Sequence, residues 1–130
     1  MTVRASGGAK TRGLAVLDTG ASLSAIDREV ALGLALPTHG AAQWSAISAL
    51  GPDRPIAPLR TATLSLADDP RLWELELLEI PGLIQAARGS RVVALIGWNF
   101  LDQCVLSCDG PSRTFSLTLP DPVGSAHRRR

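Results

Sequence analysis

Short apolar stretches separated by turn-forming residues run through the whole chain. Residues 13–17 form a continuous apolar run that ends at Asp18, which predicts a buried strand. Residues 92–96 form a second, β-branched run that stops at Gly97. Residues 72–80 alternate between apolar side chains and glutamates, which predicts a strand with one buried face and one wet face.

One helix is predicted directly after the first strand. Ser24 has the form of an N-cap, with the acidic residue Asp27 three positions further on. Apolar residues then recur at helical spacing, at Ile26, Val30 and Leu34. Residues 98–103 are long enough for one or two further helical turns.

The remaining pattern favours strands and hairpins. Strands are expected over residues 43–50, 56–66, 105–107 and 114–119. The first two flank residues 51–55, which are dense in glycine and proline, so they are expected to form a hairpin. The sequence therefore predicts an all-β chain with one or two short helices.

Composition limits the chain to a single globular domain without a strong charge. It has 130 residues, 45% hydrophobic, with a formal net charge of +1. We expect a flexible N-terminal arm over residues 1–12, a domain over residues 13–119 and a flexible C-terminal tail over residues 120–130. The only basic run, residues 128–130, is in that tail, so a nucleic-acid partner is not expected.

Few residues are suited to holding a metal or cofactor. Cys104 and Cys108 lie four apart in a predicted strand, about 13 Å from each other, which is too far for a disulfide, so both are expected to be buried thiols. His39 and His127 are the only histidines, and the spacing offers no zinc site. No apolar run is long enough for a membrane span or signal peptide, which predicts a cytoplasmic protein without a membrane partner.

The residue best placed for chemistry is Asp18, in the segment Leu17-Asp18-Thr19-Gly20. A carboxylate at the end of a packed strand is at least partly desolvated, which is typical of catalytic acids and bases. Thr19 adds a hydroxyl, and Gly20 permits a tight turn and the close approach of another chain. The simpler interpretation is an Asx turn in which Asp18 only caps the loop.

The context of this segment resembles the active site of the retropepsin-like aspartic proteases. LAVLDTGASLSAID is similar to the family's D-T-G-A segment, and ALIGWNFLDQ is similar to its later apolar pair followed by glycine and a short helix. The resemblance covers residues 13–119 and implies a closed β-barrel. It also implies that the hairpin tip near residues 49–54 is the flap that covers substrate.

The resemblance assigns roles to individual residues. It implies that Asp18 is catalytic, that Thr19 locks the active-site loops of two copies across a two-fold axis and that Gly20 lets the substrate backbone approach. Substrate contacts are implied for Ala21, Ser22, Ala49, Leu50, Gly51, Pro52, Ile96 and Gly97. Two positions depart from the family: Ser22 replaces an aspartate of the retroviral enzymes, and residues 50–55 hold one glycine and two prolines, which implies a stiffer flap.

A single D-T-G determines the expected assembly. Aspartic-protease chemistry needs two carboxylates that share one proton, and each chain supplies one. A two-fold homodimer brings Asp18 of both copies to the axis. The sequence therefore predicts a homodimeric aspartic endopeptidase that hydrolyses peptides or proteins and needs no cofactor or metal.

Other candidates match their motifs poorly. Residues 6–11 resemble a phosphate loop but lack its glycine before the lysine and precede a strand. His39 has no nucleophile-elbow sequence to pair with, and Asp68-Asp69 reads as a surface turn. The tryptophans, expected in the core or a dimer interface, are Trp44, Trp73 and Trp98.

Two other functions stay open from the sequence. One is a non-catalytic module of the same fold that dimerises or binds peptides, with Asp18 kept for structure. The other is a small nucleic-acid adaptor acting through the arginines of the tail.

Overall fold

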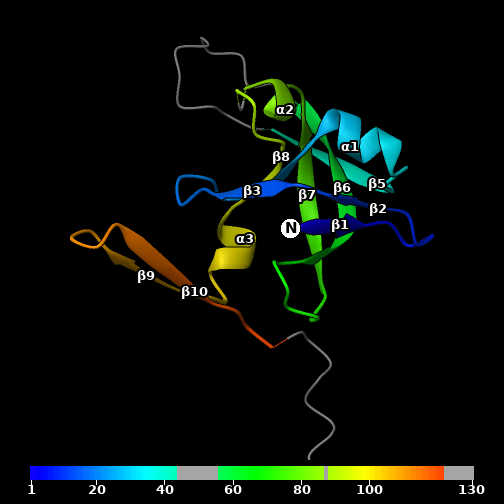
Figure 1. Ribbon diagram of the computed structural model, residues 1–130. Helices are drawn as coiled ribbons and strands as arrows, with labels where there is room; N and C mark the ends of the chain where they lie inside the picture. Colours follow the sequence, from blue (N-terminus) through cyan, green and yellow to red (C-terminus); the bar gives the residue numbers. More distant parts are fainter. Residues whose placement is uncertain (44–55, 87, 122–130) are drawn as a thin grey trace, which may run out of the picture.

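The computed structural model spans residues 1–130 and describes residues 1–43, 56–86 and 88–121. Strands make up most of the described chain (Figure 1). They are β1 (Thr2–Arg4), β2 (Lys10–Arg12), β3 (Leu14–Leu17), β4 (Ser24–Asp27), β5 (Thr38–Gln43), β6 (Ile56–Ser65), β7 (Trp73–Ile80), β8 (Val92–Ile96), β9 (Val105–Asp109) and β10 (Thr114–Thr118).

The described residues also form three short helices, where one or two were expected. They are α1 (Arg28–Gly33), α2 (Leu83–Ala86) and α3 (Trp98–Leu101). One of them, α2, is a single turn within residues 81–90, a segment that the sequence predicts to be irregular or briefly helical.

Eight strands form one curved sheet in the order β2-β1-β6-β7-β4-β8-β3, with β5 added to the first part of β6. The end strands β2 and β3 are joined through Gly13 alone, so the sheet curls into a nearly closed barrel. A Cβ on Gly13 would lie 2.9 Å from the Arg91 carbonyl oxygen and collide with Val93. Only glycine lets the chain pass this close to β8. The close approach at Gly13 allows β3 to pair with β8.

The core lies inside this barrel and follows the predicted alternation of β7. Trp73, Leu75 and Leu77 are buried, while Glu74 and Glu76 are exposed. The Trp73 ring meets the ring of Phe100 from α3 edge to face, with centroids 5.7 Å apart. Such aromatic pairs add to the apolar area that each ring buries.

Residues 1–12 differ from the flexible arm expected from the sequence. They form the β1–β2 hairpin, and β1 pairs with the end of β6 through Thr2 and Ser65. Val3 is fully buried, and the Met1 ammonium donates a hydrogen bond to the Gly13 carbonyl. Their local pattern is polar, so the pairing comes from a strand some 60 residues later in the chain, which local pattern does not reveal.

The helix predicted after Ser24 begins later than expected. Residues 24–27 form β4, and α1 starts at Arg28 with Asp27 as its N-cap. One Asp27 carboxylate oxygen accepts the Glu29 N–H at 2.8 Å, and the other accepts the Ile84 N–H at 3.2 Å. The fully buried Asp27 side chain therefore fastens both α1 and α2 to the sheet.

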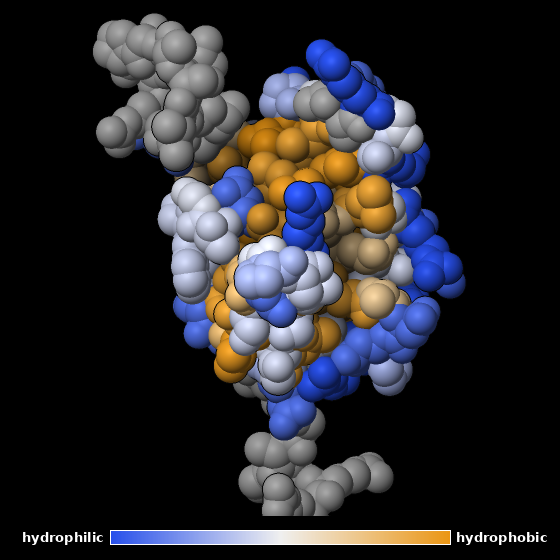
Figure 2. Space-filling view, turned by 60° about the vertical axis from the view of Figure 1, so that its left-hand side comes forward, coloured by the Kyte–Doolittle hydropathy of each residue, from blue (hydrophilic) through white to orange (hydrophobic). Residues whose placement is uncertain are grey.

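Strand β3 is less buried than its apolar sequence predicts. It is an edge strand paired with β8 on one side, and Leu14 and Val16 are 57% and 44% exposed. Val105 and Phe115 of the separate β9–β10 hairpin are also exposed, at 63% and 66%. Figure 2 shows apolar surface on the side of the molecule that carries these elements.

The cysteines differ in burial, against the expectation of two buried thiols. Cys104 is partly buried ahead of β9, and burial raises the pKa of its thiol, with a smaller contribution from Asp102. Cys108 lies within β9 and is exposed, because this hairpin packs little surface against the barrel. Both are free thiols, as predicted.

Candidate active-site loop

Asp18 is the first residue of the loop that joins β3 to β4. The parallel pairing of β3 with β8 ends at Leu17 opposite Ile96, and the Asp18 N–H extends it by donating to the Ile96 carbonyl at 2.9 Å. The paired carboxyl ends of these strands therefore fix the backbone of Asp18. Its side chain is half-buried.

The loop turns back on the Asp18 carboxylate. Oδ1 accepts the Gly20 N–H at 2.9 Å, and the Asp18 carbonyl accepts the Ala21 N–H at 3.2 Å. A Cβ on Gly20 would lie 3.2 Å from Oδ1, so glycine keeps this turn open. Among the described residues, no hydrogen-bond donor reaches Oδ2. The Asx turn weighed from the sequence is thus present, and it orients the carboxylate while leaving one oxygen available.

The first residues of α3 hold this loop from the other side. The Trp98 N–H donates to the Ala21 carbonyl at 2.9 Å, and the Asn99 N–H donates to the Ser22 carbonyl at 3.1 Å. The Trp98 indole N–H donates to the Thr19 carbonyl at 2.7 Å. Because these bonds reach Thr19, Ala21 and Ser22 of the loop, the two sequence segments 18–22 and 96–101 form one structural unit.

The buried Ser24 and the partly buried Asn99 connect the base of the loop to the sheet. The Ser24 hydroxyl and N–H both donate to Asn99 Oδ1, at 2.7 and 2.8 Å, and the hydroxyl accepts the Gly97 N–H at 2.9 Å. Asn99 Nδ2 donates to the Glu76 carbonyl on β7. These uncharged side chains satisfy one another, which makes the support rigid without adding charge beside Asp18.

Gly97 is required by the crossing of the two chain segments. A Cβ there would lie 2.7 Å from both the Ala21 and Leu23 carbonyl oxygens. Gly97 is buried and Ile96 is 0% exposed. The structure therefore gives these two residues a place beneath the loop, whereas the sequence led us to expect them in contact with substrate.

The other expected site residues fall into two groups. Thr19, Gly20 and Ser22 are exposed on the loop, and Ala21 is half-buried there. The expected flap residues Ala49, Leu50, Gly51 and Pro52 lie outside the described residues. Trp98, expected in the core or an interface, is 47% exposed beside the loop, and Trp73 is in the core.

The alternative catalytic candidates lie apart from this loop. His39 on β5 contacts Glu76 at 2.8 Å and the Thr61 hydroxyl at 3.0 Å, on the exposed face of the sheet. Within the described ranges, no group of three or more His, Cys, Asp or Glu side chains is arranged to hold a metal ion.

One buried glutamate with two arginine partners was not predicted from the sequence. Glu79 is 4% exposed on β7 and pairs with Arg28 at 3.1 Å and Arg60 at 2.6 Å. Arg60 also donates to the Leu36 carbonyl at 2.7 Å. The alternation of β7 ends before Glu79, so only the arrival of two arginines from other elements accounts for its burial.

No described helix has the length and apolar character needed to cross a membrane. Comparison with protein-family models, curated proteins and solved structures finds no match for the chain.

Proposed function

We propose that two copies of this chain form an aspartic endopeptidase of the retropepsin-like type, with Asp18 of each copy in one shared active site. The observation that carries the proposal is the carboxylate of Asp18 on a loop held by backbone turns and by Ser24, Trp98 and Asn99. A catalytic group must be held in a fixed geometry by its surroundings, and this loop meets that requirement.

The chemistry needs both carboxylates and a water molecule between them. One carboxylate, ionised, removes a proton from water as the water attacks the peptide carbonyl carbon. The other, protonated, donates its proton to the carbonyl oxygen. The tetrahedral intermediate then collapses, the C–N bond breaks and the amine leaves with a proton from the pair.

Exposed apolar surface near the loop supports the two-copy arrangement. Leu14 and Val16 lie on the edge strand that leads to Asp18, and Val105 and Phe115 lie on the hairpin that follows α3. The loop and the hairpin project to the same side of the molecule, on the left in Figure 1. Apolar surface of this kind favours contact with another protein surface, and a two-fold axis through it would pair the two loops.

Hydrolysis of an unfolded protein tests the proposal. Wild type should cleave fluorescein-labelled denatured casein at acidic to neutral pH, and Asp18→Asn should lose at least about a hundredfold in rate, because an amide cannot remove the proton. Asp102→Asn is the matched control, since Asp102 is exposed at the end of α3. Near-normal cleavage by Asp18→Asn would overturn the proposal.

The two alternatives give different outcomes in the same assays. A non-catalytic module of this fold would bind unfolded peptide equally well with and without Asp18→Asn and would cleave none. A nucleic-acid adaptor would bind single-stranded nucleic acid with an affinity that falls steeply with salt and depends on the arginines at 128–130. The architecture of the Asp18 loop favours the endopeptidase.

A further inference from the structure

A polar hollow lies between the outer face of the β2–β1–β6 strands and the loop that follows β6. Its volume is about 230 Å³. Thr2 and Arg4 face it from β1, and their strand partners Arg12, Ser65 and Lys10 face it from either side. Its remaining wall is formed by Ala67, Asp68, Asp69, Pro70 and Leu72. None of these residues belongs to the Asp18 loop or to its supports.

Positive charge dominates the hollow. No carboxylate among the described residues lies within ion-pair distance of Arg4, Lys10 or Arg12. Asp69 on the wall is already paired with Arg71 at 2.7 Å. Within the described part of the chain, Asp68 is therefore the one acidic side chain of the wall without an ion pair. Three cations, Arg4, Lys10 and Arg12, face it.

The floor of the hollow includes one hydrogen-bond donor that lacks a protein acceptor. Arg4 Nε is buried and has no hydrogen-bond partner in the described chain. Thr2 and Ser65, which are 8% and 6% exposed, line the hollow together with Arg4. A buried donor without an acceptor is unfavourable, so this arrangement calls for an acceptor from outside the chain.

We propose that this hollow binds a phosphate-class oxyanion, either inorganic phosphate or the phosphoryl group of a small phosphomonoester. Guanidinium groups donate to phosphate oxygens in pairs, and a tetrahedral oxyanion has more acceptor positions than a carboxylate for the surrounding hydroxyls and cations. The volume exceeds that of the ion alone, which leaves room for a small organic group. This site is independent of the proposed peptidase.

Isothermal titration calorimetry with the full chain tests the site. Sodium phosphate should bind saturably, and sodium chloride at equal ionic strength should not. Arg12→Gln and Arg4→Gln should each weaken phosphate binding about tenfold or more, since each removes a charge-assisted donor. Arg12 is exposed, so its replacement leaves the core intact if Arg4→Gln fails to fold.

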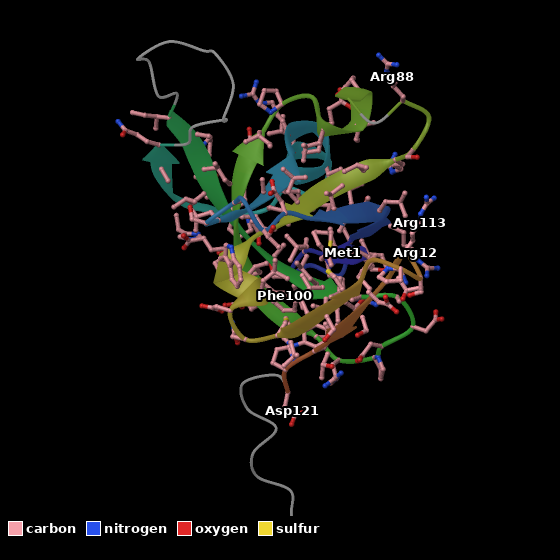
Figure 3. All side chains as sticks on the ribbon, turned by 90° about the vertical axis from the view of Figure 1, so that its left-hand side faces the viewer. Met1, Arg12, Arg88, Phe100, Arg113 and Asp121 are labelled. Carbon is pink, nitrogen blue, oxygen red and sulfur yellow. The ribbon has the colours of Figure 1, made fainter. Side chains whose placement is uncertain are left out.

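Two further variants separate recognition from general charge effects. Arg88→Gln makes the same chemical change at an exposed site far from Arg12, as Figure 3 shows, and should leave the affinity unchanged. Asp68→Asn should tighten binding, because it removes the opposing carboxylate. Equal weakening by Arg88→Gln and Arg12→Gln, or no saturable binding of phosphate, would overturn the proposal.

To distinguish the two sources of the phosphoryl group, the affinity for glycerol 3-phosphate is compared with the affinity for inorganic phosphate. Tighter binding of this monoester than of inorganic phosphate identifies the ligand as a small organic phosphate, and equal binding identifies the ion itself. The Asp18→Asn variant should bind both as wild type does. Failure of the peptidase proposal therefore leaves this result unaffected, and the reverse also holds.

Discussion

The backbone around Gly97 has no room for a side chain. Gly97→Ala should lower the free energy of unfolding by about 1–3 kcal/mol, because a methyl group there forces two backbone carbonyls apart. It should also displace the Asp18 loop, since one of those carbonyls belongs to Ala21 in that loop. Urea unfolding followed by tryptophan fluorescence measures the stability change.

Gly33→Ala is the control for this substitution. Gly33 ends α1, and a Cβ there would meet no atom within 4 Å. Alanine should therefore be neutral or stabilise by up to about 1 kcal/mol, through its better helix propensity. An equal loss of stability in both variants would contradict the account of Gly97.

The positions of single residues were predictable where the local sequence pattern marked them. Asp18 and Gly97 directly follow apolar runs, and the strands β3 and β8 end just before them, as the sequence predicted. Ser24 and Asn99 were not recognised as a pair because 75 residues separate them. A buried hydroxyl and its acceptor leave no local pattern, so Ser24 looked like an N-cap.

At the scale of elements, Asp27 connects α1 and α2 to β4. Asp27→Ala should lower the free energy of unfolding by about 2–4 kcal/mol, because the Glu29 and Ile84 N–H groups both lose their acceptor. Asp27→Asn keeps one acceptor oxygen and should lose about half as much. Equal stability of wild type and Asp27→Ala in urea unfolding would show that neither helix depends on this side chain.

The loop between β6 and β7 contains a pH-dependent ion pair between Asp69 and Arg71. The Arg71 side chain, and then its backbone N–H, donate to Asp69 and lower the pKa of that carboxyl below its ordinary value near 3.8. A lowered folded-state pKa stabilises the fold above the unfolded pKa, and the stabilisation is lost as pH falls through the folded pKa. The stability difference between wild type and Asp69→Asn should therefore be largest near neutral pH and shrink in acid.

The Arg71→Gln background isolates this effect. Arg71 also donates to the Leu119 and Pro120 carbonyls, so its removal loosens the segment after β10. In that background, Asp69→Asn should change stability by a similar small amount at every pH. A wild-type difference that stays constant or grows in acid would contradict the pairing.

Elements with a strong internal pattern were predictable, and elements that depend on distant partners were not. Val92–Ile96 forms β8 as expected, and the alternation of β7 was correct up to Leu77. The strands β1 and β2 were missed because they are short: β1 gains stability from pairing with the distant β6, and β2 gains it from pairing with β1. The run in β3 predicted burial, but its place at the sheet edge leaves alternate residues exposed.

At the scale of the whole molecule, one side of the nearly closed barrel has exposed apolar surface. Trp98 is 47% exposed there, close to the Asp18 loop and bonded to it through Thr19. Phe115 extends the apolar surface onto the β9–β10 hairpin. In the proposed dimer, burial of this surface supplies the association energy and aligns the two loops.

Mixing of active and inactive chains tests the shared active site most directly. Wild type and Asp18→Asn are combined in equal amounts, diluted to allow exchange, and concentrated again. Random pairing leaves about a quarter of the dimers with both aspartates, so peptidase activity per wild-type chain should fall to about half. Exchange is verified separately by energy transfer between labelled chains. Unchanged activity per wild-type chain after verified exchange would mean that one chain holds a complete site, and would contradict the account.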